Sequence, residues 1–200
     1  MTGNMDEMDL NERVSLIESM IAEGRRTTES WGWMFVLWGV AYYVAIAWSL
    51  WGHGAAAWPV TMIAASVLTG ILAGRKTRSR PATTVGRAIG SVWMGVGISM
   101  FVVFMALGIS GRLTDTGLYV AVAAAMLGTA NLASSMILRW KVQLGCAVVW
   151  LATAVAACFV SGAQAMIVFV IAIFLCQIVF GFYGTAREAG QRKMRGAAHA

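Results

Sequence analysis

The chain has 200 residues, of which 59% are hydrophobic and 12% are charged, and its formal net charge at neutral pH is +6. Soluble domains usually carry about 25% charged residues, so this composition excludes an ordinary soluble domain and is typical of a membrane protein. The Lys and Arg residues are gathered into a few short segments between apolar runs, as membrane topology requires, so the positive charge does not indicate a nucleic acid partner.

The first thirty residues are polar and acidic, with seven acids against three arginines. Apolar residues recur among them at spacings of four, three and four, which puts them on one face of a helix. They are Leu10, Val14, Ile17 and Ile21. The pattern predicts a cytoplasmic amphipathic helix in segment 1–30 that docks on its own protein. A short self-association seam and a helix lying on the lipid surface are the alternatives.

Six runs without charged residues follow, and the first, of 21 residues, is long enough to cross roughly 30 Å of hydrocarbon, whereas the second is shorter. The expected spans are 31–51, 58–74, 88–110, 116–138, 142–160 and 163–184. The sequence therefore predicts an all-α, six-transmembrane-helix bundle, made of three hairpins within residues 31–186 and followed by a basic tail at 187–200.

The loop between the second and third spans, residues 75–87, carries five basic residues. Lys and Arg next to membrane spans stay on the cytoplasmic side. Of 15 Lys and Arg residues, Arg112 alone would then lie outside. We expect both termini in the cytoplasm and a plasma (inner) membrane whose anionic head groups attract the basic segments. Three arginines of the loop, Arg75, Arg78 and Arg80, are expected to attract the acidic helix.

No expected span contains Asp, Glu, Lys, Arg or His. Ion-coupled pumps and intramembrane hydrolases place such groups within the membrane, so no enzyme activity is expected. The histidines, His53 and His199, lie in a loop and in the tail, and the cysteines Cys146, Cys158 and Cys176 form no CxxC pair. We therefore expect no metal site and no cofactor.

The uncharged polar residues of the fourth and sixth spans form the candidate site. Asn131 and Gln177 lie at matching depths, and Ser135 is one turn from Asn131. They either pair across neighbouring helices or line a cavity for a neutral solute. In the first span, Trp38 and Tyr42 either stack on an aromatic ligand or pack as ordinary core and lipid-facing residues.

Glycines at helical spacing predict close approach of helices, either within the chain or between chains. The glycines with this spacing are Gly70, Gly74, Gly86, Gly90, Gly97 and Gly128.

The beginning of the chain resembles that of a group of uncharacterised bacterial six-span proteins. The residues that carry the resemblance are Ile17-Glu18-Ser19-Met20-Ile21, Arg25-Arg26, Trp31-Gly32-Trp33 and Leu37-Trp38-Gly39. In that group a short amphipathic helix runs into a Trp- and Gly-rich first span, which implies the same layout here. The size and topology are also similar to the substrate-binding components of energy-coupling-factor vitamin transporters.

These features favour a non-enzymatic membrane module that acts by assembly, either as a homo-oligomer or with a partner membrane subunit. The alternative is a carrier or binding component for a neutral or aromatic small solute.

Overall fold

The computed structural model describes residues 12–20, 22, 31–77, 84–112 and 115–198, and every regular element within these ranges is a helix. Residues 12–20 form a short helical segment. The further elements are α2 (Gly32–Trp48), η1 (Ser49–His53), α3 (Gly54–Thr77), α4 (Thr84–Ile109), α5 (Thr116–Leu138), α6 (Lys141–Ala157), α7 (Gly162–Ile173), η2 (Phe174–Val179) and α8 (Phe180–Ala198).

Five helical stretches are long and apolar enough to cross a membrane: Gly32–Gly52, Ala56–Arg75, Thr84–Ile109, Thr116–Leu138 and Gly162–Gly190. α6 is also apolar but has only 17 residues. Large apolar side chains such as Ile98, Val155 and Ile171 are exposed around the bundle. A soluble protein rarely exposes apolar surface on this scale, so the fold is that of a membrane protein.

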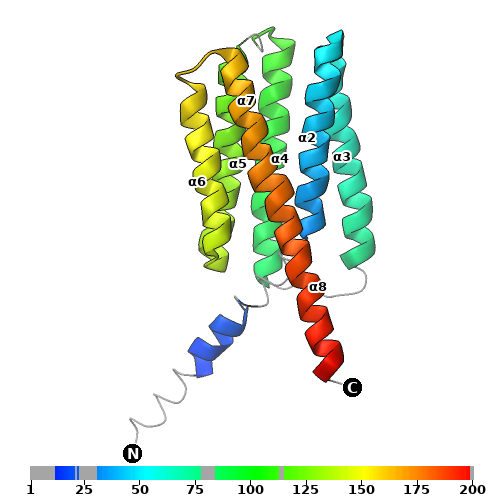
Figure 1. The fold of residues 1–200 in the computed structure, drawn as a ribbon, viewed down its shortest axis with the longest axis vertical. Helices are drawn as coiled ribbons and strands as arrows, with labels where there is room; N and C mark the ends of the chain where they lie inside the picture. Colours follow the sequence, from blue (N-terminus) through cyan, green and yellow to red (C-terminus); the bar gives the residue numbers. More distant parts are fainter. Residues whose placement is uncertain (1–11, 21, 23–30, 78–83, 113–114, 199–200) are drawn as a thin grey trace, which may run out of the picture.

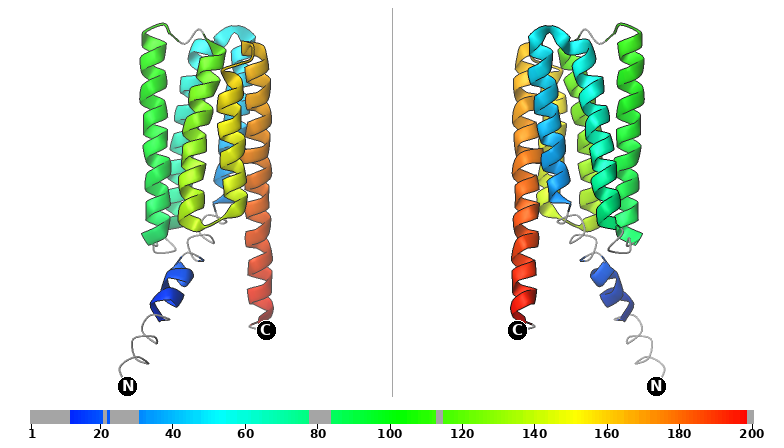
Figure 2. Two further views of the ribbon diagram at one scale, coloured as in Figure 1. Left: turned by 90° about the vertical axis from the view of Figure 1, so that its left-hand side faces the viewer. Right: turned by 90° about the vertical axis from the view of Figure 1, so that its right-hand side faces the viewer.

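α2 to α7 stand side by side, and α8 continues the line of α7 beyond the bundle (Figures 1 and 2). α5 packs along α6 and also against α4 and α7, whereas α2 packs against α3, η2 and α8. α3 and α4 follow each other in the chain but have no extensive packing with one another, and α5 is visible between them in the right panel of Figure 2.

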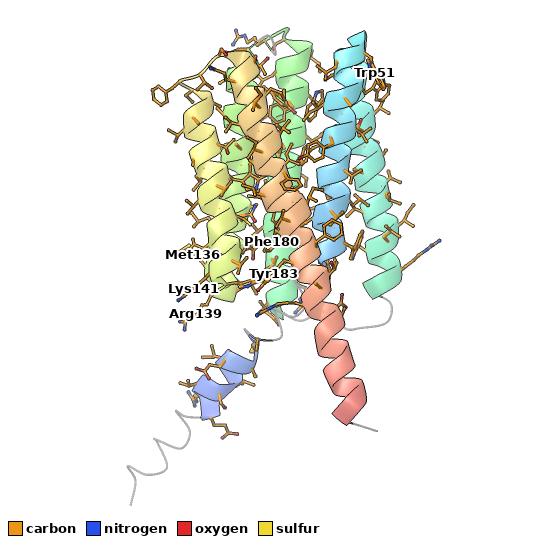
Figure 3. The ribbon with its side chains drawn as sticks, in the orientation of Figure 1. Trp51, Met136, Arg139, Lys141, Phe180 and Tyr183 are labelled. Carbon is orange, nitrogen blue, oxygen red and sulfur yellow. The ribbon has the colours of Figure 1, made fainter. Side chains whose placement is uncertain are left out.

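The two ends of the bundle differ in their charged residues. Arg139 and Lys141 lie at the end from which α8 projects, and Trp51 lies at the opposite end (Figure 3). Arg75 lies in the last turn of α3, on the Arg139 side, and Arg112 lies in the turn on the Trp51 side. We call the end with Arg139 and Lys141 the basic end.

The turns at the opposite end are closed by side-chain caps. Asp115 precedes α5, and its Oδ1 accepts hydrogen bonds from the backbone N–H groups of Gly117 and Leu118 at 2.8 and 3.2 Å. Ser161 and Gln164 form a capping box at the start of α7. The Asp115 carboxylate therefore caps a helix.

The expected sixth span and the basic tail are one helical stretch from Gly162 to Ala198. Residues 174–179 of this stretch are π-helical, which inserts a wider turn between α7 and α8. The tail is therefore a continuation of the last helix as far as Ala198.

α4 lies at the edge of the bundle. It contacts the core through half-buried residues at helical spacing, among them Trp93, Met100 and Phe104, and of its 26 residues only Ile89 is buried. Its remaining surface, which includes Met94 and Phe101, is exposed.

Candidate functional site

Asn131 on α5 and Gln177 on η2 are both buried, with 1% and 2% of their surface exposed. Asn131 Nδ2 donates a hydrogen bond to the carbonyl oxygen of Leu127 in its own helix at 2.9 Å. Neither Asn131 Oδ1 nor Gln177 Oε1 accepts a hydrogen bond, so the two amide groups do not form the mutual pair that the sequence leaves open. Both oxygens remain available to another donor.

Two further polar side chains belong to this region. Gln143 on α6 is 0% exposed, and both its Oε1 and its Nε2 lack partners. Ser134 is fully buried, and its Oγ also lacks a partner, whereas Ser135 donates to the carbonyl oxygen of Leu132. We call Asn131, Ser134, Gln143 and Gln177 the amide cluster.

The sequence indicates that Gln143 is buried, although the residue lies near the start of its span. Gln143, Ala147, Trp150 and Ala154 recur at spacings of four, three and four, and all are buried on α6. A glutamine two residues after Lys141 is easily assigned to the membrane interface. Its place in this stripe indicates instead that it faces the core.

Cys146 and Cys176 meet beside the amide cluster. Cys176 Sγ lies 3.6 Å from the carbonyl oxygen of Cys146, to which its S–H donates, and both thiols are free and buried. Cys158 is exposed. Among the described residues, no three His, Cys, Asp or Glu side chains are placed to hold a metal ion.

Aromatic side chains form a layer nearer the opposite end. Tyr42 lies 6.2 Å from Phe169 and 6.3 Å from Trp58 between ring centroids, and Trp58 lies 5.0 Å from Tyr119. Tyr42 is buried and Trp38 is half-buried, 6.2 Å from Tyr42. These aromatic residues pack on one another in the core of the structure.

Glycines hold α2 against the last helix. A Cβ atom on Gly39 would lie 2.9 Å from Gln177 Cβ, and one on Gly181 would lie 2.8 Å from the carbonyl oxygen of Gly32. Only glycine permits such close approach of two helix backbones. The seven-residue spacing of Gly32 and Gly39 is visible in the sequence, and it is the signal that could have predicted this contact.

The glycines singled out in the sequence divide into two groups. A Cβ on Gly128 would lie 2.8 Å from Leu151 Cδ2, so this glycine packs closely within the chain. Around Gly70, Gly74, Gly90 and Gly97, a Cβ would meet no atom of the described chain within 4 Å. Those four therefore provide no close packing between the described helices. Gly86 is half-buried in the first turn of α4.

In the described part of the amphipathic helix, two residues of the apolar stripe are exposed. Val14 and Ile17 are 50% and 56% exposed, and the segment lies beyond the basic end of the bundle (Figure 1). No described residue of the chain therefore covers these two side chains. Arg75 is exposed at the end of α3. The other residues expected to dock, Leu10, Ile21, Arg78 and Arg80, lie outside the described residues.

Comparisons with protein-family models, with curated proteins and with solved structures return no match to this chain.

Proposed function

We propose that this chain is a non-enzymatic membrane protein of six crossing helices that acts by assembling with a second copy of itself. α6 supplies the sixth crossing, because its 17 residues span about 25 Å at 1.5 Å per residue. The basic end then lies on the cytoplasmic side of a bacterial inner membrane, with both termini on that side.

The observation that carries the proposal is the unfilled glycine face of α4. Gly90 and Gly97 are seven residues, or about two helical turns, apart and so lie on the same side of the helix. A Cβ atom at either position would meet nothing within 4 Å in the described chain. Glycine on an exposed membrane helix weakens the helix without packing benefit, unless another helix approaches there.

The occupant that fits this face best is the same face of a second copy. Met94 and Phe101 alternate with the two glycines along it, at positions i, i+4, i+7 and i+11, and both are exposed. A two-fold interface brings one surface against itself, so that surface must offer both projections and recesses. The glycines provide recesses and the two large side chains provide projections.

The amphipathic helix supports the same proposal. Its apolar residues Val14 and Ile17 are exposed, and it carries Glu12 and Glu18, whereas Arg75 and Arg87 are exposed at the ends of α3 and α4. Burying one such apolar side chain is worth about 1.5–3 kcal/mol. Docking on a neighbouring copy would bury the stripe and bring opposite charges together in the same layer.

The test is the association of the purified protein in lipid bilayers, measured by energy transfer between donor- and acceptor-labelled copies as the lipid-to-protein ratio rises. The wild type should show specific transfer that unlabelled protein displaces. The double variant Gly90→Leu, Gly97→Leu should reduce the apparent association at least tenfold, because the leucines fill the recesses at positions where a Cβ atom meets nothing of the described chain within 4 Å.

Gly95→Leu is the matched control. Gly95 is also exposed on α4, and a Cβ atom added there would meet no atom within 4 Å, but it faces a different side, about 120° or more around the helix from Gly90 and Gly97. It should leave association unchanged. Transfer that follows random mixing in the wild type, or equal effects of the two substitutions, would contradict self-assembly through this face.

A further inference from the structure

We infer that the amide cluster binds a small neutral molecule rich in hydrogen-bond donors. The inference concerns the interior of a single chain and does not depend on the proposed self-assembly. It rests on the unpartnered polar atoms of four buried side chains and on the depth at which neighbouring helices bring them together.

Each side chain of the cluster has at least one polar atom without a hydrogen-bond partner. Unpartnered atoms are Oδ1 of Asn131, Oγ of Ser134, Oε1 of Gln177, and both Oε1 and Nε2 of Gln143. The orientation of the Asn131 amide is set by the bond from its Nδ2 to Leu127, which leaves Oδ1 as the free atom. Buried polar atoms are paired in most folded proteins, so this concentration of unpaired atoms calls for a partner from outside the chain.

Contacts between helices place the cluster at a common depth. Leu151 lies against Gly128, so the antiparallel α5–α6 pair puts Ser134 opposite the residue that precedes Cys146. Cys176 on η2 reaches the backbone of Cys146. Positions on α5, α6 and η2 can therefore be compared along one axis, starting from the level of Cys146.

The four residues lie within about 7.5 Å of one another along the bundle axis. At 1.5 Å per residue, Ser134 and Gln177 are each about 1.5 Å from the level of Cys146 along this axis. Asn131 is about 3 Å toward the opposite end, and Gln143 is about 4.5 Å toward the basic end. All four are buried, and α6, which carries Gln143, packs against both α5 and η2.

The balance of free atoms specifies the chemistry of the occupant. Three amide oxygens require donors, one amide NH₂ group requires an acceptor, and the Ser134 hydroxyl can donate or accept. None of the residues of α5, α6 or η2, which are all described, is acidic, so a bound cation would have no counter-charge. Burying an unpaired charge is far more costly than burying a neutral group. A neutral molecule with several N–H or O–H groups fits.

The backbone around the cluster is also unusual. Gln177 and Cys176 lie in the π-helical turn of the last span, and π turns within α-helices are frequently found at functional sites. Gly39 allows α2 to approach Gln177 Cβ, so that side chain is enclosed by α2 as well. Water and a small organic amide or polyol share the required chemistry, and the experiment distinguishes them.

The test uses the full chain in nanodiscs and compares Gln143→Met and Gln177→Met with the wild type by thermal unfolding. Methionine keeps the length of glutamine but removes its hydrogen bonds. If a bound molecule satisfies the amides, both variants should unfold at a lower temperature, by a few degrees. If no molecule is bound and the amides have no hydrogen-bond partners, both variants should unfold at a higher temperature, because the apolar replacement removes the cost of desolvating an unpaired amide.

Thr153→Val is the matched control. Thr153 is buried on α6, but its hydroxyl already donates to the carbonyl oxygen of Val149 in its own helix, so its replacement should not affect an occupant. Acetamide and glycerol serve as probes. A rise in unfolding temperature with either probe in the wild type and in Thr153→Val, and its loss in Gln143→Met, assigns a small organic solute.

A density map of the wild type completes the test. A non-protein feature within hydrogen-bonding distance of the Gln143 amide supports the inference. The feature is assigned to water if neither probe shifts the unfolding temperature. Higher unfolding temperatures for both methionine variants would overturn the inference. So would a map in which the amides of Asn131, Gln143 and Gln177 bond directly to one another with nothing between them.

Discussion

Gly181 and Gly145 both lie within helices but differ in their surroundings. A Cβ on Gly181 would lie 3.0 Å or less from two backbone atoms of α2, the carbonyl oxygen of Gly32 and the nitrogen of Val36. Backbone atoms cannot move aside as the end of a flexible side chain can. A Cβ on Gly145 would meet no atom of the described chain within 4 Å.

Alanine at these two positions should therefore have opposite effects. Gly181→Ala forces α2 and α8 apart, and overpacking of this kind costs typically about 1–3 kcal/mol. Gly145→Ala replaces a poor helix former by the best one and should be neutral or stabilising by up to about 1 kcal/mol. Reversible unfolding in mixed micelles measures both. Equal effects would mean that the contact between α2 and α8 is looser than the structure has it.

Spacing in the sequence predicts that a glycine or an amide faces another helix, but it does not say which helix. Gly128 and Gly97 are both glycines at helical spacing, yet Leu151 packs on the first and nothing in the described chain packs on the second. The depth of Asn131 and Gln177 in their spans is enough to predict them as site residues. Gln143 is not predictable from its depth, because it lies near the start of its span, and only its place in the buried stripe of α6 indicates that it faces the core.

At the scale of single elements, the helix of residues 12–20 is the part that differs most from expectation. Its apolar stripe predicts the helix, and the helix is present. The docking does not follow from the stripe alone, because an amphipathic pattern is equally suited to the chain's own surface, a neighbouring copy or lipid. Exposure of Val14 and Ile17 in the single chain leaves a neighbouring copy and lipid, and the proposal assigns the neighbouring copy.

Amide hydrogen exchange tests this assignment. In nanodiscs that hold one copy, residues 12–20 should exchange fast, and Ile17→Asp should not change the rate. In bilayers where copies associate, exchange should slow in the wild type and in Glu18→Gln but stay fast in Ile17→Asp, because apolar contact contributes more than an exposed ion pair. Slow exchange in single-copy nanodiscs would show that the helix docks on its own chain.

At the scale of the whole molecule, the all-helical fold was predictable, because the long runs without charged residues admit little else in a membrane. The five long apolar stretches and the shorter α6 follow those runs. The peripheral position of α4 was not predictable. Its sequence is as apolar as that of α5, and only the packing of the bundle determines that Ile89 alone becomes buried on it.

The proposed orientation can be tested with cysteine labelling of intact cells, in a background where the exposed Cys158 is replaced by Ser. Arg112→Cys should react with a membrane-impermeant maleimide from outside. Arg139→Cys should react only after permeabilisation, because the basic end faces the cytoplasm. Reaction of Arg139→Cys in intact cells would invert the orientation, and reaction of both variants would rule out the arrangement of six crossings.

The π-helical turn at 174–179 changes the rotational phase of the last helix. A hydrogen bond from i to i+5 accommodates one more residue per turn than the α-helical pattern, so every residue after the turn is rotated by about 100° relative to an uninterrupted α-helix. Phe169 faces the aromatic layer before the turn, and Gly181 meets Gly32 after it. Deletion of a single residue between 174 and 179 would therefore allow an uninterrupted α-helix in which Gly181 still faces α2. An α-helical turn at the unchanged length would instead rotate Gly181 away from α2, so the contact with Gly32 depends on the wider turn.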